Sequence, residues 1–406
     1  MLSTEQFKET RMNNTNCDVL IIGAGGAGLM CAIHAGKKGR KVIVLDHAEK
    51  VGKKILISGG GRCNFTNTGA SADRYQSGNK HFMKSAFGRY TPDNFINLVE
   101  SYNIAYHEKK LGQQFCDKSA QQIVDMLLNE CAENGAKIQL NTEVRNVEKN
   151  NSTFNVSTNK GTFSAAKLVV ATGGLSIPKM GATNFGHKLA EKFNLEVTEL
   201  TPALVPFTFS TKDLERYTDL SGISIDADVS CGKTSFRENI LITHRGVSGP
   251  AILQISSYWK PGQEIKIRML PELNWQEYLK EKRAENGKAE LKTVLCDILP
   301  KRFAQRLFEW GDMQNKPMAE LGDKEIRRIE EYFTNFRIKP NGTEGYRKAE
   351  VTLGGVSTKE LDAKTLESKK VQGLHFIGEV VDVTGWLGGY NFQWAWASGF
   401  ACGQSL

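Results

Sequence analysis

The chain has 406 residues, 40% of them hydrophobic, so it can form two domains and bury a sizeable core. This composition excludes global disorder. The formal net charge of +8 favours anionic partners such as phosphates. The chain has no run of five or six basic residues, so a dedicated nucleic-acid tail is not expected.

The eight cysteines form no Cys-x-x-Cys pair, and no cysteine and histidine have zinc-ligand spacing. We therefore expect no metal site and no disulfide scaffold, which is typical of a reducing cytoplasm. The first 16 residues are polar and lack the apolar segment of a signal peptide. No apolar stretch reaches the roughly 18 residues of a membrane span. The sequence thus predicts a flexible leader over 1–16, no membrane segment and a cytoplasmic protein.

The first predicted elements are an apolar strand at 18–22, a helix at about 26–38 and a second apolar strand at 41–46. Strand, glycine turn, helix and strand make one βαβ unit. Residues 70–135 are expected to be mainly helical, with the clearest helix at 119–133. Strands and hairpins are predicted over 137–165, and another buried strand at 167–171.

The pattern changes near Thr201 and Pro202. Short strands are predicted over 203–270 and helices over 272–337, followed by strands at 350–353 and 373–378 and a helix at 391–402. The simplest architecture is an α/β fold with a discontinuous nucleotide-binding domain, built from 17–200 and 342–406. Residues 201–341 form an inserted domain in this interpretation.

The segment Gly23–Gly28 matches the pattern G-x-G-x-x-G in the context that the pattern requires, after a buried strand and at the start of a helix. Gly23 permits the tight turn, Gly25 lets the backbone approach a pyrophosphate, and Gly28 lets helix and strand pack closely. The helix N-terminus offers N–H groups to the phosphates. Asp46 ends the second strand, where an acid can bind ribose hydroxyls. The turn predicts a dinucleotide but does not separate FAD from NAD.

Four further segments carry long motifs, at 53–67, 243–250, 350–359 and 378–393. In sequence and in order, they resemble the signatures of the YhiN/BaiN-like NAD(P)/FAD-dependent oxidoreductases, and the likeness runs from about Cys17 to the end. The resemblance implies FAD in a glutathione-reductase-like Rossmann-type domain with a parallel sheet, and an inserted domain that is part β-barrel and part helical. Activities in that family include reduction of a conjugated enone on a bile-acid-like ring and oxidation of small amines, so the substrate stays open.

With the resemblance, the motifs give a set of candidate FAD contacts. In chain order these are Gly23, Gly25, Gly26, Ala27, Gly28, Asp46, His47, Lys54, Ser58, Gly60, Gly61, Arg62, Cys63, Asn64, Val144, Ala171, Thr172, Gly173, Gly378, Glu379, Asn391, Phe392 and Gln393.

Several of these residues have a stated chemical role. The glycines after Ser58 form a loop poor in side chains that can lie against the cofactor. Arg62 can meet a phosphate or the reduced flavin, or else form a surface salt bridge. Cys63 lacks a second cysteine two residues away, so disulfide exchange is not expected. Glu379 stands where related flavoproteins have an acid that binds the ribityl chain, and Asp382 is the alternative.

The last predicted helix and the ends of two strands complete the candidate site. The helix N-terminus at Asn391 can stabilise negative charge at the flavin N1–C2=O edge. Val144 begins a strand where related folds hold adenine through backbone groups. Ala171–Gly173 ends a buried strand, where the chain passes close to the cofactor.

The source of electrons and protons is less defined. Residues 201–341 contain no second G-x-G-x-x-G, so NAD(P)H is expected to dock transiently at the flavin, unless another donor reduces it. His244, Arg245 and Tyr390 are the candidate catalytic residues. A histidine in a turn is also often structural.

The sequence therefore predicts a soluble flavoenzyme that passes a hydride between a small organic substrate, or NAD(P)H, and the flavin N5. One alternative is a flavin-dependent RNA-modifying enzyme, which should carry a clustered basic face. Another is a non-enzymatic flavin redox sensor. The expected partner is a small molecule rather than nucleic acid, and the oligomeric state stays open.

Overall fold

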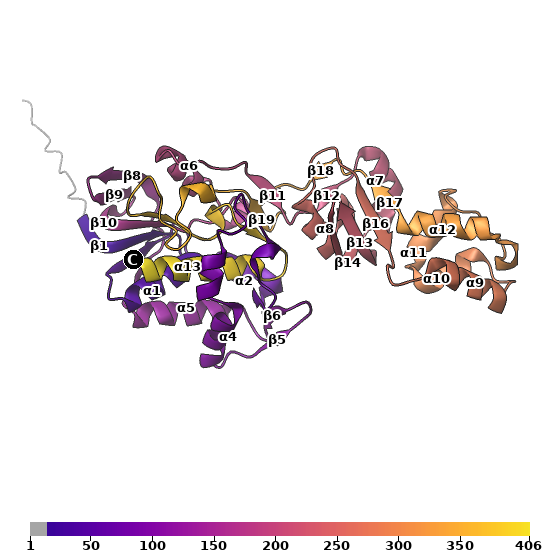
Figure 1. Ribbon diagram of the computed structural model, residues 1–406, viewed down its shortest axis with the longest axis horizontal. Helices are drawn as coiled ribbons and strands as arrows, with labels where there is room; N and C mark the ends of the chain where they lie inside the picture. Colours follow the sequence, from indigo (N-terminus) through magenta and orange to yellow (C-terminus); the bar gives the residue numbers. More distant parts are fainter. Residues whose placement is uncertain (1–13) are drawn as a thin grey trace, which may run out of the picture. The chain divides into compact units, whose positions relative to one another are not determined.

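The computed structural model describes residues 14–406 and divides them into two units, 14–201 with 351–406, and 202–350 (Figure 1). Residues 1–13, most of the predicted leader, lie outside the described residues. The leader prediction is wrong at its end, because 14–16 already belong to strand β1 (Asn14–Ile22) and pair with β10 (Gly161–Val170). No helix between residues 14 and 406 is long and apolar enough to cross a membrane.

A mixed sheet forms the centre of the first unit. Its order is β7-β2-β1-β10-β9-β8, and β20 also pairs with β10. The pairs among β7, β2, β1, β10 and β20 are parallel, whereas β9 pairs antiparallel with β10 and β8. The further strands are β2 (Val42–Leu45), β7 (Lys137–Gln139), β8 (Val144–Asn150), β9 (Thr153–Thr158) and β20 (Leu374–Phe376). β2 is buried along its whole length, as expected for a parallel strand with both faces covered.

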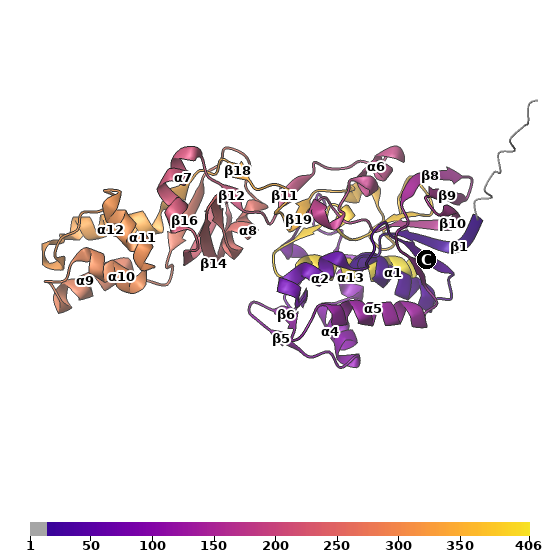
Figure 2. The same ribbon diagram turned by 180° about the vertical axis from the view of Figure 1, so that it is seen from behind.

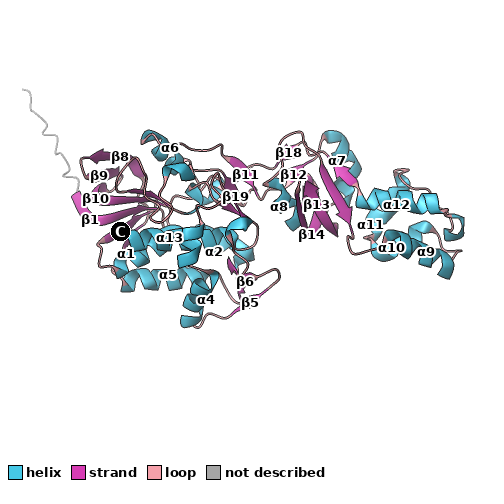
Figure 3. Cartoon of the chain, viewed as in Figure 1, coloured by secondary structure: helices cyan, strands magenta, loops and turns pink. Residues whose placement is uncertain are grey.

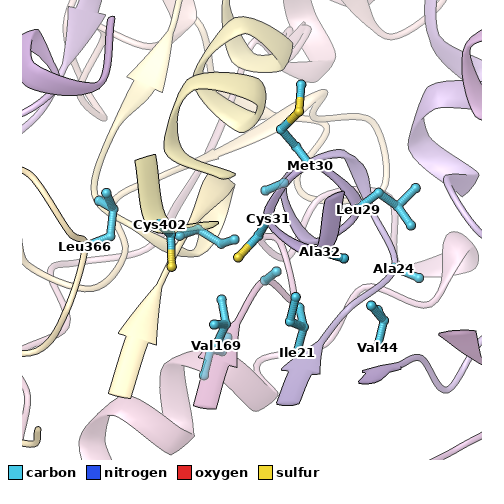
Figure 4. Close-up of a cluster of buried hydrophobic side chains, with 14 of the residues drawn as sticks. Ile21, Ala24, Leu29, Met30, Cys31, Ala32, Val44, Val169, Leu366 and Cys402 are labelled. Carbon is cyan, nitrogen blue, oxygen red and sulfur yellow. The ribbon is translucent and has the colours of Figure 1, made fainter. Parts of the chain in front are cut away.

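Helices α1 (Gly26–Lys37), α5 (Gln121–Glu133) and α13 (Tyr390–Ser405) lie together on one face of this sheet (Figures 1 and 2). Two glycines of α13 let it approach α1 closely. A Cβ on Gly399 would lie 2.5 Å from the carbonyl oxygen of Ala27, and one on Gly403 would lie 2.7 Å from that of Cys31. Figure 4 shows Cys31 and Cys402 of the two helices among the buried side chains of this contact.

The part expected to be mainly helical, 70–135, also contains strands. β5 (Tyr106–Glu108) and β6 (Gln113–Cys116) form a hairpin, and β6 pairs with β3 (Asn64–Asn67). These strands are short, and β3 and β6 lie far apart in the chain, so local periodicity does not reveal them. Helix α2 (Lys53–Ile57) precedes this region, α3 (Lys84–Arg89) and α4 (Pro92–Ser101) lie within it, and α6 (Phe185–Lys192) follows later.

The second unit contains a sheet followed by helices (Figure 3). The sheet order is β17-β16-β13-β14-β15-β12-β18, which has two ends, so the described residues form an open sheet rather than the expected barrel. Its strands are β12 (Phe207–Thr208), β13 (Ser224–Cys231), β14 (Thr234–Thr243), β15 (Gly246–Ser248), β16 (Ile265–Met269), β17 (Phe336–Ile338) and β18 (Gly342–Thr343). Its helices are α7 (Thr211–Tyr217), α8 (Pro250–Ser256), α9 (Trp275–Glu285), α10 (Leu291–Ile298), α11 (Lys301–Glu309) and α12 (Asp323–Thr334).

The return to the first unit lies at residue 351, later than the expected 342. The reason is that β18 pairs with β12, which keeps 342–350 in the second unit. The chain passes between the units at β11 (Thr201–Ala203) and β19 (Val351–Leu353).

Candidate functional site

The glycine turn between β1 and α1 has the geometry of a phosphate-binding turn. Gly23 has a φ of 113°, which favours glycine, and a Cβ on Gly28 would lie 1.9 Å from the Gly23 carbonyl oxygen. A Cβ on Gly25 would meet nothing within 4 Å. Gly28 is thus required by packing, whereas the space beside Gly25 is open at the N-terminus of α1. A pyrophosphate bound at a helix N-terminus would lie in open space of this kind.

The carboxylate of Asp46 binds backbone N–H groups of the glycine turn and of the segment that follows β2. Its Oδ2 accepts a hydrogen bond from the N–H of Ala24 at 2.7 Å, and its Oδ1 accepts one from the N–H of Ala48 at 2.8 Å. Both oxygens therefore already order the chain around the site. The neighbouring His47 side chain is half exposed. Ribose binding by Asp46 stays a prediction, and it would use the remaining lone pairs of the carboxylate.

The C-terminal segment reaches the same turn. Gly378 has a φ of 71°, and a Cβ there would lie 2.8 Å from the Cβ of Ala27. A Cβ on Gly26 would lie 2.6 Å from the indole ring of Trp396. Residues from the two ends of the chain are therefore in van der Waals contact around the start of α1.

Lys54, Ser176 and Glu379 form a polar cluster next to this contact. The Lys54 Nζ lies 2.8 Å from Glu379 Oε2 and 2.6 Å from Ser176 Oγ. The other carboxylate oxygen of Glu379 accepts the N–H of Thr352 at 3.0 Å. Burial alone would raise the pKa of Glu379, but the Lys54 ammonium and the backbone N–H groups of Thr352 and Gly174 hold it below its ordinary value. Glu379 is therefore an anion in the folded protein.

The loop from Ser58 to Asn64 combines open glycines with a buried thiol. Gly60 and Gly61 have positive φ angles, and a Cβ on Gly60 would meet nothing within 4 Å. Cys63 is fully buried, and burial raises the pKa of its thiol to about 12. Such a thiol is a poor nucleophile. Arg62 is exposed, and no ion pair of its side chain occurs within residues 14–406.

Asn64 is buried, and its amide is satisfied by backbone when the oxygen accepts from Gly389 N at 3.2 Å and the nitrogen donates to Thr66 O at 3.1 Å. The amide thus connects β3 to the loop before α13. Any contact of the Asn64 amide with FAD would have to compete with these hydrogen bonds.

The strand ends occupy the positions that the sequence predicted. Ala171 is buried and donates its N–H to Ile22 O at 2.8 Å, next to the glycine turn. The hydroxyl oxygen of Thr172 is buried and lacks a hydrogen-bond partner within residues 14–406. Gly173 has a φ of 72°. Val144 begins β8 and pairs with Thr158. A buried hydroxyl without a partner is costly, so Thr172 marks a place for a polar ligand group.

The side chains in the first turn of α13 form hydrogen bonds and packing contacts within the protein. Asn391 accepts the N–H of Gly385 at 2.8 Å and donates to Gly385 O at 3.0 Å. Gln393 is fully buried between Thr66 Oγ1 at 2.7 Å and the carbonyl of Tyr90 at 2.9 Å. Phe392 stacks on Trp396. Any flavin contact of this turn is therefore expected from its backbone N–H groups rather than from these amides.

The three candidate catalytic residues lie in different units. His244 and Arg245 are exposed at the tip of the β14–β15 hairpin, and Arg245 lies 3.5 Å from Glu344. Tyr390 lies in the first unit, is 3% exposed, and accepts a hydrogen bond from Arg74 at 3.3 Å. The structure thus places Tyr390, and not the other two, in the same unit as the candidate FAD contacts.

Sequence reasoning missed Arg74, Ser176 and Thr352. Ser176 and Thr352 hydrogen-bond to Glu379, and Arg74 lies beside Tyr390. None lies in a glycine motif or at a strand end. Thr352 does stand inside the motif at 350–359, which was the available signal.

The family described as HI0933-like protein Rossmann domain matches residues 17–405. The chain belongs to this family. The chain is 50% identical over 390 residues to a ribosomal RNA dihydrouridine synthase of Escherichia coli (strain K12), covering 96% of this chain and 98% of the relative. It is 48% identical over 393 residues to the protein of the same name from Haemophilus influenzae (strain Rd), covering 95% and 98%. A 3-dehydro-bile acid delta(4,6)-reductase of Clostridium scindens is 29% identical over 404 residues, covering 95% and 98%.

Membership makes this HI0933-like protein an FAD-dependent oxidoreductase. The residues present fit the cofactor on two counts. The space beside Gly25 accepts a ligand at the N-terminus of α1, and the buried Thr172 hydroxyl offers an unused hydrogen-bonding group. The predicted FAD dependence is confirmed, and these residues are compatible with it, while the contacts assigned to single residues stay predictions.

Proposed function

We propose that this protein reduces uridine to dihydrouridine in ribosomal RNA. The observation that carries the proposal is the identity of 50% and 48%, over nearly the whole chain, to two relatives named for that activity. Both alignments span each relative almost completely, so the inserted unit is included. The net charge of +8 supports an anionic substrate such as RNA.

The chemistry joins this proposal to the more distant relative. Uridine carries a C5=C6 double bond conjugated to its C4 carbonyl. A delta(4,6)-reductase of a 3-dehydro bile acid is likewise named for saturating double bonds conjugated to a ketone. Both reactions add a hydride to one alkene carbon and a proton to the carbon next to the carbonyl. The first unit would supply the same chemistry to either substrate.

In this proposal the glycine turn, Asp46, Thr172 and the Lys54–Glu379 pair would hold FAD. FAD supplies the hydride when reduced, and NAD(P)H is the proposed donor that reduces it. The sequence alone favoured a small-molecule substrate and gave RNA as the alternative. Here RNA is the proposed substrate, and the small molecule becomes the alternative. It agrees with the predicted cytoplasmic location, which stays a prediction.

The test uses the purified FAD-loaded protein and ribosomal RNA transcribed in vitro, which contains no modified nucleosides. The two are incubated with NADH or NADPH, and the RNA is digested and analysed for dihydrouridine by mass spectrometry. The matched control is Gly25→Val, in which the side chain occupies the open space of the turn. Dihydrouridine with the native protein alone supports the proposal. Unchanged RNA together with reduction of a 3-oxo-4,6-diene steroid would instead identify a small-molecule reductase.

A further inference from the structure

Arg74 is fixed beside Trp386 by a small antiparallel pair of strands. β4 (Tyr75–Gln76) pairs with β21 (Thr384–Gly385), so that the residues flanking the two strands meet. The N–H of Trp386 donates to the Arg74 carbonyl at 3.2 Å. The guanidinium of Arg74 lies 4.8 Å from the centre of the Trp386 ring, within cation–π distance. The loop that precedes α13 therefore lies against a positioned cation.

No carboxylate among residues 14–406 lies within ion-pair distance of Arg74, although the charge of the neighbouring Asp73 interacts with it. Its side-chain partner within residues 14–406 is the hydroxyl of Tyr390, to which Nη1 donates at 3.3 Å. The nearby Asp73 carboxylate instead accepts from Ser71 Oγ at 2.6 Å, and none of its oxygens reaches salt-bridge distance of Arg74. A half-buried guanidinium held by an aromatic ring and a phenol keeps most of its N–H groups for an external partner.

Tyr390 is positioned by hydrogen bonds to its hydroxyl and to its backbone carbonyl. Its backbone carbonyl accepts the hydroxyl of Tyr75 at 2.7 Å, which fixes the residue at the start of α13. Because the Tyr390 oxygen accepts from Arg74, its own proton points elsewhere. A Cβ added to Gly69 would lie 3.6 Å from this oxygen, at ordinary van der Waals distance.

We propose that Arg74 binds the carbonyl oxygen on which negative charge develops during reduction, and that Tyr390 donates the proton that completes it. The proposal rests on the proposed function and names the residues that would carry it out. When C6 of uracil accepts a hydride, the C5=C6 electron pair moves to the C4 oxygen as an enolate. The Arg74 guanidinium stabilises that enolate. C5 then takes the proton of the Tyr390 hydroxyl, and the tyrosinate beside Arg74 regains a proton from water.

Three physical features fit this assignment. A fixed cation is most effective where charge appears only during the reaction, because its orientation needs no further reorganisation. Burial raises the pKa of Tyr390, and the Arg74 guanidinium opposes that rise, so the phenol stays protonated at neutral pH. Trp386 is partly exposed, so the stacked Arg74–Trp386 pair lies near the surface, where a base of single-stranded RNA can approach.

The test separates the two half-reactions of the FAD-loaded protein under anaerobic conditions. Flavin bleaching by NAD(P)H is followed first, and flavin reoxidation by unmodified ribosomal RNA or by a 3-oxo-4,6-diene steroid second. Arg74→Gln and Tyr390→Phe should slow reoxidation by about 100-fold or more and leave bleaching nearly unchanged. Arg74→Lys, which keeps the charge, should lose less. The control is Arg216→Gln, at a second arginine stacked on a tryptophan, Trp310 at 4.6 Å, and it should leave both rates unchanged.

A binding measurement provides a readout independent of turnover. Barbiturate is a planar pyrimidine that is anionic at neutral pH and resembles the enolate, whereas uracil is neutral. Quenching of tryptophan fluorescence should show a preference for barbiturate over uracil of about tenfold in the native protein, and the preference should vanish in Arg74→Gln.

The failures of the two proposals are distinguishable. Absence of dihydrouridine in RNA contradicts the proposed function, while the steroid acceptor still tests Arg74 and Tyr390. Unchanged reoxidation by every acceptor in a correctly folded, FAD-loaded Arg74→Gln protein would overturn the assignment of Arg74. The same result for Tyr390→Phe would remove it as the proton donor.

Discussion

The ammonium of Lys54 lies 2.8 Å from the carboxylate of Glu379, although 325 residues separate the two in the chain. The pair connects α2, which follows the βαβ unit of the glycine turn, to the segment that precedes α13. Ser176 contacts both side chains, at 2.6 Å from the ammonium and 3.3 Å from the carboxylate. A single polar cluster thus joins two predicted cofactor contacts, Lys54 and Glu379, through Ser176, which the sequence did not predict.

Replacing Lys54 by Met should destabilise the first unit and weaken FAD binding. Glu379 would be left without its cation, at a cost of about 1–3 kcal/mol after allowing for the 31% exposure of the Lys54 side chain. Urea unfolding at neutral pH measures the loss. A control is Lys37→Met, which breaks the ion pair with Glu130, also at 2.8 Å but outside the candidate site. That control should lower stability without changing FAD affinity.

The Lys54 effect should depend on pH. The pKa of Glu379 is lowered in the folded protein, so its contribution to stability is complete above the unfolded value near 4.5 and is lost as the pH falls through the folded pKa. The stability difference between the native protein and Lys54→Met should therefore be largest near neutral pH and shrink in acid. A difference that grew on acidification would contradict the assigned charge.

Gly25 and Gly28 should respond differently to the same substitution. A valine at Gly25 extends into open space, so Gly25→Val should fold with near-native stability and yet be colourless. A valine at Gly28 meets the Gly23 carbonyl oxygen, and overpacking of this kind costs about 1–3 kcal/mol or more. Flavin absorbance and thermal unfolding separate the two cases. A yellow Gly25→Val protein would refute the position given to the pyrophosphate.

Asp46→Ala should weaken FAD binding even without direct loss of a ribose contact. The substitution leaves the N–H groups of Ala24 and Ala48 without their acceptor, at about 1–3 kcal/mol for each buried group. Asp46→Asn keeps one amide oxygen and should lose less. FAD titration of the apoproteins gives the order native, Asp46→Asn, Asp46→Ala. Equal affinity of all three would show that Asp46 neither orders the turn nor binds the ribose.

The cysteines should be almost unreactive in the native state. Seven of the eight are buried and Cys296 is partly exposed, so a thiol reagent should titrate about one group rapidly and eight after unfolding. Burial raises the pKa of Cys63 to about 12 and of Cys116 to about 12. Cys63→Ala should therefore retain flavin reduction by NAD(P)H. If Cys63→Ala kept FAD but lost reduction by NAD(P)H, the Cys63 thiol would have to take part in the reaction.

Much of the first unit could be predicted because its signals are local. The apolar runs at 18–22 and 41–46 correspond to β1 and β2, and the glycine pattern falls between β1 and α1 as expected. The family resemblance and the FAD dependence are confirmed. Short periodicities and fixed glycine spacings can be recognised in the sequence without knowledge of tertiary contacts.

The remaining features depend on contacts between distant segments. The pairing of β3 with β6, the amide of Gln393 bound by Thr66 and Tyr90, and the stack of Arg74 on Trp386 all join residues far apart in the chain. Propensity gives no signal for such pairs. The sequence therefore predicted that Gln393 contacts the cofactor. In the structure, both ends of its amide form hydrogen bonds within the protein. Arg74 was not among the predicted site residues.

The most direct test of the central claim is a single anaerobic turnover with RNA. The protein is bleached with NAD(P)H, freed of excess donor, and mixed with unmodified ribosomal RNA. We expect the flavin absorbance to return and dihydrouridine to form in equal amount to the flavin oxidised. Flavin that stays reduced with this RNA, but is reoxidised by an unsaturated ketone, would contradict the claim that uridine is the substrate.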